Sequence, residues 1–174
     1  MARMSRGTAR ARSDGVELPP FQRFLDMHRD TVYRYLVFAA GPEEADDAFQ
    51  ETFMAALRAY PTLRGAENLR GWILKIAHNK AIDAARARGR RPVPVAEPPE
   101  LPEPPAAAAT SDGMDAELWS RVRELPPKQR GAVLLRFVGD LEHAQIARAL
   151  DCSEEAARRN LHVGLQRLRE EWTR

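Results

Sequence analysis

Two neighbouring segments near the C-terminus carry residues that could bind duplex DNA. A short helical pattern over residues 142–150 is followed by a tight turn and a longer helical pattern over residues 153–172. Early in the second pattern, Arg159 and His162 face outward and Arg158 lies on the flank of the same face. A short helix, a tight turn and a helix with basic residues near its start form the helix-turn-helix pattern, whose second helix enters the major groove. Arginine there pairs with guanine through two hydrogen bonds, at about 1–3 kcal/mol of discrimination. The alternative is an αα-hairpin with a solvated basic face.

A second basic segment extends from Arg70 to Arg91, with seven Lys or Arg residues and one acid, Asp83. Its cations predict a salt-dependent attraction to phosphates. His78 and Asn79 lie among them and could contact bases. The alternative is a solvated helix face, and Trp72 in the same segment is expected to pack in a core.

A third cluster is acidic and contains no basic residue. Its members are Glu43, Glu44, Asp46, Asp47 and Glu51. Adjacent carboxylates on a helix point in different directions, and no histidine lies nearby, so neither acid–base catalysis nor a metal site is favoured. An acidic face on a helix rich in Phe and Ala is typical of docking onto a basic protein surface, and the alternative is an ordinary exposed face.

Other reactive residues give no coherent site. Cys152 is the single cysteine, which excludes a disulfide within the chain and a zinc site of several cysteines. His143 and His162 are not spaced to form a zinc site with it. A glycine-rich phosphate loop and a Ser-His-Asp arrangement are both absent from the sequence. The sequence therefore predicts no enzyme, no cofactor and no metal.

Helices must position these residues, since no segment shows a strand pattern and the predicted fold class is all-α. Apolar residues recur at steps of three and four along each predicted helix. The expected helices cover residues 20–40, 43–60, 68–88, 115–123, 127–138, 142–150 and 153–172. Gly89 is expected to end the third helix.

A proline-rich segment divides the chain into two small helical domains. Seven of the 13 prolines fall within residues 92–111, which cannot bury a core. We expect a disordered basic tail (1–15), a first domain (16–91), a flexible acidic linker (92–113) and a second domain (114–174).

Charge is distributed unevenly along the 174 residues. The net charge is +5 over residues 1–91, −6 over 92–117 and +3 over 118–174. Two basic blocks on either side of an acidic connector indicate a polyanionic partner contacted at two places. Mean hydropathy is −0.51, and neither a membrane helix nor a secretory signal is evident. We therefore expect a soluble cytoplasmic protein without membrane insertion.

The residues of both domains resemble one protein family. The segments DDAFQETF (46–53) and LRGWILKIAHNKAID (69–83) resemble region 2 of extracytoplasmic-function (ECF, group IV) sigma-70 factors. The segments LPPKQR (125–130) and LLRF (134–137), with the helix-turn-helix after them, resemble region 4 of that family. The match covers both domains in the order found in the family.

The resemblance implies a promoter-specificity subunit that binds bacterial core RNA polymerase and promoter DNA, with an anti-sigma factor as a further partner. The positions matching the polymerase-docking residues are Asp46, Asp47, Gln50, Glu51 and Phe53. In the family, a loop and the helix after it recognise and melt the −10 element. The positions matching the loop are residues 63–68, and Asn68 ends this loop. The matching positions on the helix are Arg70, His78, Asn79, Lys80, Asp83 and Arg86. Arg158, Arg159 and His162 match the positions that read the −35 element. The acidic linker is expected to run toward the RNA exit channel.

The second domain departs from the usual family pattern at several positions, and alternative functions remain open. The chain has Ala156-Ala157 where the family usually has Thr-Val, and it lacks further arginines at Val163 and Leu165. These departures predict an unusual −35 sequence or a smaller contribution from region 4. The alternative functions are a free-standing helix-turn-helix regulator, which would bind DNA without polymerase, and an adaptor that sequesters a partner.

Overall fold

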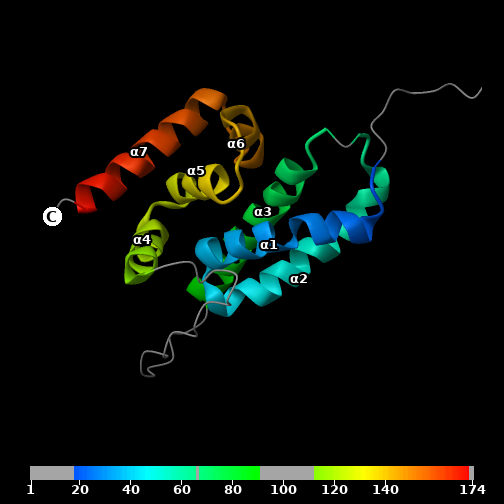
Figure 1. The fold of residues 1–174 in the computed structure, drawn as a ribbon, viewed down its shortest axis with the longest axis horizontal. Coiled ribbons are helices and arrows are strands. Elements are labelled where there is room, and N and C mark those ends of the chain that lie inside the picture. The colour runs from blue at the N-terminus through cyan, green and yellow to red at the C-terminus, as the bar shows by residue number, and fades with distance from the viewer. Residues whose placement is uncertain (1–17, 66, 91–111, 173–174) are drawn as a thin grey trace, which may run out of the picture.

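Seven α-helices make up the part of the chain that the computed structural model describes, residues 18–65, 67–90 and 112–172 (Figure 1). In chain order they are α1 (Phe21–Ala40), α2 (Pro42–Ala59), α3 (Leu69–Arg90), α4 (Asp112–Glu124), α5 (Pro127–Phe137), α6 (His143–Ala149) and α7 (Glu154–Trp172). A 3-10 turn at Tyr60–Thr62 follows α2, and the described residues contain no strand. The all-α prediction is confirmed. The predicted tail, 1–15, and most of the predicted linker lie outside the described residues.

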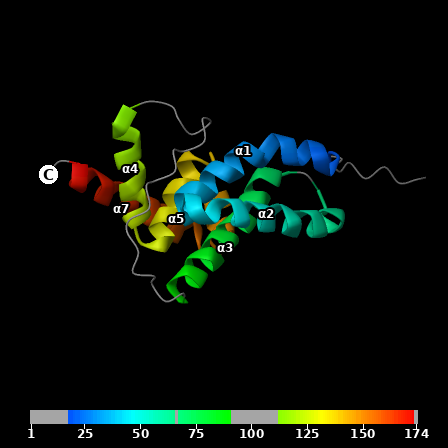
Figure 2. The same cartoon turned by 90° about the horizontal axis from the view of Figure 1, so that it is seen from below.

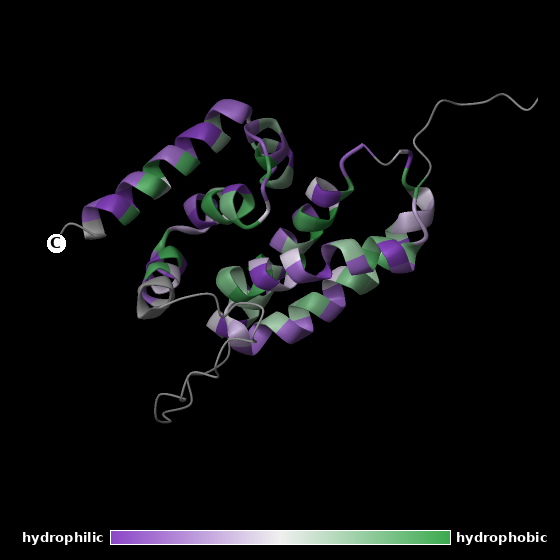
Figure 3. Cartoon of the chain, in the orientation of Figure 1, coloured by the Kyte–Doolittle hydropathy of each residue, from purple (hydrophilic) through white to green (hydrophobic). Residues whose placement is uncertain are grey.

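The first three helices pack against one another in a bundle, seen at the lower right of Figure 1 and from below in Figure 2. Its fully buried side chains include Phe24, Tyr35, Leu36, Ile73 and Leu74. Hydrophobic residues gather where these helices face one another (Figure 3). Burying a large apolar side chain contributes about 1.5–3 kcal/mol, so this shared core holds α3 in place.

Aromatic rings fill the end of this bundle near the start of α1. The ring of Phe24 lies 5.1 Å from that of Tyr60 and 5.7 Å from that of Trp72, measured between centroids. The Tyr60 hydroxyl donates a hydrogen bond of 2.6 Å to the carbonyl of Pro19. Trp72 is partly buried and packs on the core, which confirms its expected role in packing.

The far end of α3 is tied to the turn between α1 and α2. Gly41 forms that turn with φ of 102°, and its N–H donates to the carbonyl of Val37. Arg88 lies over the turn: it donates to the Ala40 carbonyl and pairs with Glu44 at 3.5 Å. The prediction that Gly89 ends the helix was wrong, since α3 continues to Arg90 and Gly89 does not adopt a left-handed conformation. The side chain of Arg88, anchored on the turn, holds the last turn of α3.

The other four helices form a second bundle around α5, which contacts α4, α6 and α7. Val133, Leu134 and Leu135 are buried in its middle. Gly164 lets α7 lie close to α5, because a Cβ at that position would be 3.0 Å from Cγ2 of Val133. The two bundles also touch each other: α1 contacts α4 and α5, and α3 contacts α6.

Side-chain caps set the turn before the last helix and the start of α6. Glu142 is the N-cap of α6, one residue before the helix rather than its first residue as predicted, and it forms a reciprocal capping box with Gln145. The Ser153 hydroxyl accepts a 3.1 Å hydrogen bond from the N–H of Ala156, which confirms the predicted N-cap of α7. These caps satisfy backbone N–H groups at the starts of α6 and α7. Within the described residues, no helix is long and apolar enough to cross a membrane.

Candidate functional site

The acidic residues of α2 line the side of the helix that faces away from α1 and α3. Glu43, Asp46, Asp47, Gln50 and Glu51 are exposed. The opposite face of the helix is buried and consists of Ala45, Ala48, Thr52, Phe53 and Ala56. Because an α-helix repeats every 3.6 residues, the buried stripe fixes which side the carboxylates present to solvent.

Two of the exposed carboxylates of this helix already have partners within the bundle. Glu51 lies 3.0 Å from Nζ of Lys80 on α3. Asp46 interacts with the hydroxyl of Tyr33 on α1, and burial together with this carboxylate raises the pKa of Tyr33. Four of the five predicted docking residues, Asp46, Asp47, Gln50 and Glu51, therefore share one exposed face.

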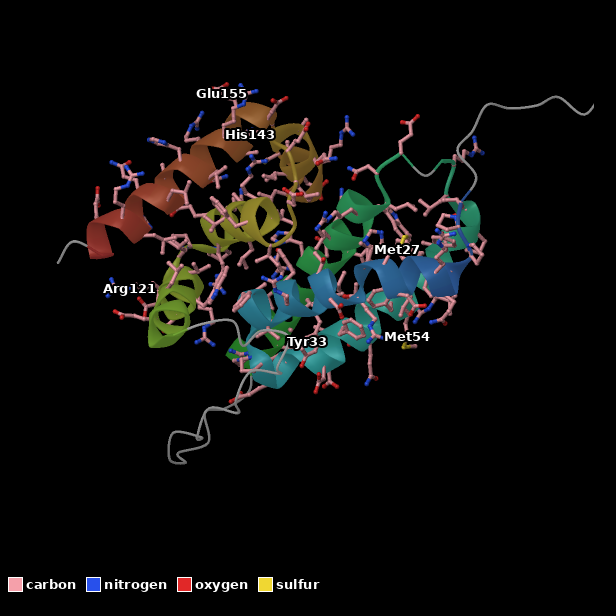
Figure 4. All side chains as sticks on the ribbon, in the orientation of Figure 1. Met27, Tyr33, Met54, Arg121, His143 and Glu155 are labelled. Carbon is pink, nitrogen blue, oxygen red and sulfur yellow. The ribbon has the colours of Figure 1, made fainter. Side chains whose placement is uncertain are left out.

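Phe53 does not lie on this face. Its side chain is only 6% exposed, and its ring packs 4.8 Å from that of Phe49 and 6.4 Å from that of Phe24. The apolar residues on the exposed face are instead Met54 and Leu57, each 54% exposed. Figure 4 shows Met54 projecting from the outer side of α2.

Met54 and Leu57 were missed by sequence reasoning, although their spacing could have located them. They follow Asp47 by seven and ten residues, which are helical repeats of the same face. The exposed surface of α2 is thus acidic in its first half, and its second half carries Met54 and Leu57 beside Arg58. We call the residues Asp46, Asp47, Gln50, Glu51, Met54 and Leu57 the α2 face.

The predicted −10 residues do not form one surface in this arrangement. Asn79, Asp83 and Arg86 are exposed and lie at helical spacing on one stripe of α3. Lys80 turns toward α2 and Glu51. Arg70 is half-buried and lies 3.8 Å from Asp140 of the second bundle.

Asn68 has a local structural role at the start of α3. Its Oδ1 accepts a 2.9 Å hydrogen bond from the N–H of Gly71, as an N-cap side chain does. A Cβ on Gly71 would lie 2.3 Å from Nδ2 of Asn68, so only glycine leaves room for this cap. In the loop before it, Arg64 and Glu67 are exposed and Gly65 has φ of 117°.

His78 is buried rather than presented to solvent. Its Nδ1 lies 2.8 Å from the Tyr35 hydroxyl, and 9% of its surface is exposed. Desolvation lowers the pKa of His78 to about 4, against the opposite influence of Asp151, so the ring is neutral at neutral pH. His78 cannot contact DNA while the two bundles are packed together, because the second bundle covers its ring.

The predicted −35 residues lie together on the outer side of α7. Arg158, Arg159 and His162 are exposed, while Ala157 and Leu161 face the bundle. Hydrophilic residues follow this outer side in Figure 3.

Both arginines are held by glutamates one turn earlier in the same helix. Arg158 pairs with Glu154, and Arg159 lies 3.3 Å from Glu155. Glu155 projects outward at the start of α7 (Figure 4). Exposed pairs of this kind contribute about 0.3–0.5 kcal/mol, so they orient the guanidinium groups and release them at little cost.

No metal centre competes with this interpretation in the described part of the chain, which contains no cluster of three or more His, Cys, Asp or Glu side chains placed to hold a metal ion. Cys152 is a half-buried free thiol in the turn between α6 and α7. The features available for function are therefore surfaces: the α2 face, the stripe of α3 and the outer side of α7.

Two segments of the sequence match models of a known protein family. Residues 22–91 match the family model described as Sigma-70 region 2, and residues 115–168 match Sigma-70, region 4. ECF RNA polymerase sigma factor SigD of Mycobacterium tuberculosis is 35% identical over 84% of this chain and 74% of its own length.

Two further relatives carry the same family name. BldN of Streptomyces coelicolor is 32% identical over 83% of this chain, and SigE of Mycolicibacterium smegmatis is 30% identical over 92%. The chain spans 57% and 64% of the lengths of these two proteins.

The fold is similar to those of two solved structures. The sigma factor RpoE of Bartonella quintana, in its complex with the anti-sigma factor NepR, superposes with a TM-score of 0.70 at 19% identity, over 86% of this chain and 94% of that chain. CnrH, in complex with the cytosolic domain of CnrY, gives 0.65 at 21% identity, over 88% and 87%. The family models matched in both parts of the sequence and the identity to SigD thus point to the same family. The chain belongs to the ECF family of RNA polymerase sigma factors.

Proposed function

We propose that this chain joins core RNA polymerase and directs it to a specific set of promoters through contacts at the −10 and −35 elements. The observation that supports it most strongly is that regions 2 and 4 occur together, in order, with the α2 face and the outer side of α7 exposed. The chain supplies recognition and has no catalytic step of its own. It would act in the cytoplasm, where polymerase and chromosome are.

The α2 face is proposed to dock on a basic surface of the polymerase. Asp46, Asp47 and Glu51 supply charge complementarity, which speeds encounter and fixes the register. Met54 and Leu57 supply apolar area that becomes buried on docking. An apolar core beside polar and charged residues is the usual anatomy of a protein–protein interface.

The exposed stripe of α3 is proposed to contact the −10 element as its strands separate. Asn79 offers an amide for base edges, and Arg86 offers a cation for the backbone. Extruding a base costs a few kcal/mol, which contacts to the freed strand must offset. Arg64 and Glu67, exposed in the loop before α3, are positioned to contribute to those contacts.

The outer side of α7 is proposed to read the −35 element as a duplex. α6 and α7 meet at the turn fixed by Ser153, so the first turns of α7 project from the bundle. Arg158 and Arg159 can exchange their glutamate partners for guanine edges or phosphates.

An anti-sigma protein is a proposed further partner. One similar fold was solved as a sigma factor bound to such a protein. A free-standing regulator is not favoured, because the family match extends over region 2, which such a regulator does not need.

The test is transcription reconstituted from core polymerase, the purified chain and genomic DNA. The proposal predicts specific start sites only when the chain is present, and no tight promoter footprint by the chain alone. A footprint on duplex DNA without polymerase would support the regulator instead.

A further inference from the structure

A row of aromatic rings leads from the core of the first bundle to the edge of the α2 face. Measured between centroids, the ring of buried Phe24 lies 6.4 Å from that of Phe53, which lies 4.8 Å from that of Phe49. Tyr33 on α1 ends the row: its ring meets Phe49 edge-on at 5.8 Å, with the planes inclined by 77°. Aromatic pairs favour this geometry, so the packed core behind it sets the position of the Tyr33 ring.

The hydroxyl of Tyr33 reaches the acidic half of the α2 face. Asp46 and Phe49 are three residues apart on α2 and are therefore neighbours on the helix surface. With its ring against Phe49, Tyr33 donates a hydrogen bond from its hydroxyl to the carboxylate of Asp46. Figure 4 shows the Tyr33 side chain between the ribbons of α1 and α2, which pack together. Burial, that hydrogen bond and the charge of Asp46 raise the pKa of the Tyr33 hydroxyl, which therefore remains a donor at neutral pH.

Asp46 and Glu51 are held by groups of different charge. Glu51 pairs with a cation, since Nζ of Lys80 lies 3.0 Å away, and this cation also repels any basic surface that approaches. The Tyr33 hydroxyl is neutral, so Asp46 is held and its charge is not cancelled. A carboxylate has about four lone-pair sites on its two oxygens. The hydroxyl uses one site and leaves the others for guanidinium or ammonium groups of a partner.

An ordered carboxylate binds a partner more tightly than one that must be ordered on binding. Fixing a flexible side chain when an interface forms costs affinity by a factor of about 2 to 12. Aspartate is short, so the lower part of this range applies to it. Asp47, the next residue, is also exposed and has no ion pair or side-chain hydrogen bond to the described residues. It therefore offers a matched comparison.

We propose that Tyr33 is a positioning residue of the polymerase-docking site: its hydroxyl holds the carboxylate of Asp46 in the orientation that a basic surface of the polymerase binds. This inference rests on the proposed function, because it assigns a residue of α1 to the docking of the α2 face. Tyr33 acts through Asp46, and the docking site therefore depends on two helices.

The test removes the hydroxyl of Tyr33 and keeps its ring. Tyr33→Phe retains the contact with Phe49, and its effect on affinity for core polymerase is compared in three backgrounds: the parent, D46A and D47A. The last two remove neighbouring exposed carboxylates, but only Asp46 accepts the hydroxyl. Fluorescence anisotropy of the full chain, labelled at its N-terminus, gives each Kd.

We expect Tyr33→Phe to raise the Kd about two- to fivefold in the parent and in D47A. In D46A the same substitution should have no effect, because the carboxylate on which Tyr33 acts is gone. An unchanged Kd in the parent would overturn the proposal, and so would an equal loss of affinity in D46A.

Tyr60→Phe is the control for a general loosening of the bundle. It removes a hydroxyl of the same bundle that donates a 2.6 Å hydrogen bond to the carbonyl of Pro19, away from the α2 face. We expect Tyr60→Phe to lower the free energy of unfolding without changing the Kd for core polymerase. If it weakens binding as much as Tyr33→Phe does, loss of packing explains both variants and the proposal is wrong.

A titration of the free chain reports the contact without polymerase. The near-ultraviolet absorbance of tyrosinate, taken as the difference between each background and its Tyr33→Phe variant, follows the ionisation of Tyr33 alone. We expect the pKa of Tyr33 to lie above 10.0 in the parent and in D47A, and to be lower in D46A, where burial alone raises it. Equal pKa values in D46A and the parent would overturn the proposal. If the chain does not bind core polymerase, the proposed function fails, while this titration still decides whether Tyr33 holds Asp46.

Discussion

Nζ of Lys80 lies 3.0 Å from a carboxylate oxygen of Glu51, and this ion pair joins α3 to α2. One partner matches a −10 position and the other a polymerase-docking position, so the pair connects the two proposed surfaces of region 2. The pair is partly exposed and contributes at most about 1 kcal/mol, which makes it an orienting contact. Because Glu51 holds an ion pair to α3, the docking surface is better tested at Asp46 and Asp47.

Reversing the charge of Asp46 and Asp47 should abolish docking. In D46K/D47K we expect the affinity for core polymerase to fall at least about a hundredfold, because like charges would then face each other across the interface. Both residues are exposed, so the helical circular dichroism spectrum should not change. Affinity is measured by fluorescence anisotropy of the labelled chain.

The matched control for that experiment is D26K/D30K, which makes the same charge change on α1. Normal core affinity in D46K/D47K, or an equal loss in the control, would contradict a docking role for the α2 face.

Phe53 and Met54 should separate stability from docking. Phe53→Ala is expected to lower the free energy of unfolding by about 3–5 kcal/mol, because the ring is buried against Phe24 and Phe49. Met54→Ala should change stability by less than about 0.5 kcal/mol and weaken core binding about tenfold. Urea denaturation and the anisotropy assay measure the two effects, and the reverse pattern would place Phe53 at the interface.

Arg158 and Arg159 should govern the dependence on the −35 sequence. Replacing either by Ala should cost about 1–3 kcal/mol of discrimination, or roughly 5- to 150-fold in the preference for intact over scrambled −35 promoters. Arg167→Ala, at an exposed position farther along α7, serves as the control. Abortive initiation assays on the two promoters give the ratio, and equal activity of the parent protein on both would refute the role of α7.

Acid should destabilise the fold through His78. Desolvation lowers the pKa of this ring from 6.5 to about 4, so the unfolded chain takes up the proton first as the pH falls. The stability is fully present above pH 6.5 and decreases below it, by about 3 kcal/mol once the pH reaches 4. The groups that face the ring are the Tyr35 hydroxyl and the Asp151 carboxylate.

This effect is measured by urea denaturation between pH 7.5 and 4. In His78→Gln the dependence on pH should flatten. His28→Gln is the comparison variant. Burial, and then the charge of Arg70, also lower the pKa of His28, but this ring is less buried than that of His78. A profile that His78→Gln leaves unchanged would show that His78 is not the group that titrates.

Local patterns predicted the helices well because most of their signals lie within a few residues. The tight turn at Asp151-Cys152 and the cap at Ser153 depend only on neighbouring atoms, and both were found. Gly89 was misread as the end of a helix: α3 continues to Arg90, and the neighbouring Arg88 donates to the carbonyl of Ala40, 48 residues earlier. A glycine can end a helix, but tertiary contacts decide whether it does.

The candidate site was predicted by residue type more reliably than by orientation. The acidic helix and the arginines of α7 lie where their helical spacing placed them. His78 could not be placed from sequence, since its burial depends on Tyr35, 43 residues earlier, and on Gly131 in the other bundle. The packing of region 4 on region 2 has no local signal, because each of its contacts joins residues far apart in the chain.

Mapping of transcription start sites with core polymerase and genomic DNA, with and without the purified chain, tests the central claim most directly. The account predicts a small set of discrete starts that require the chain and disappear with D46K/D47K. Starts that are the same in the presence and absence of the chain would contradict it.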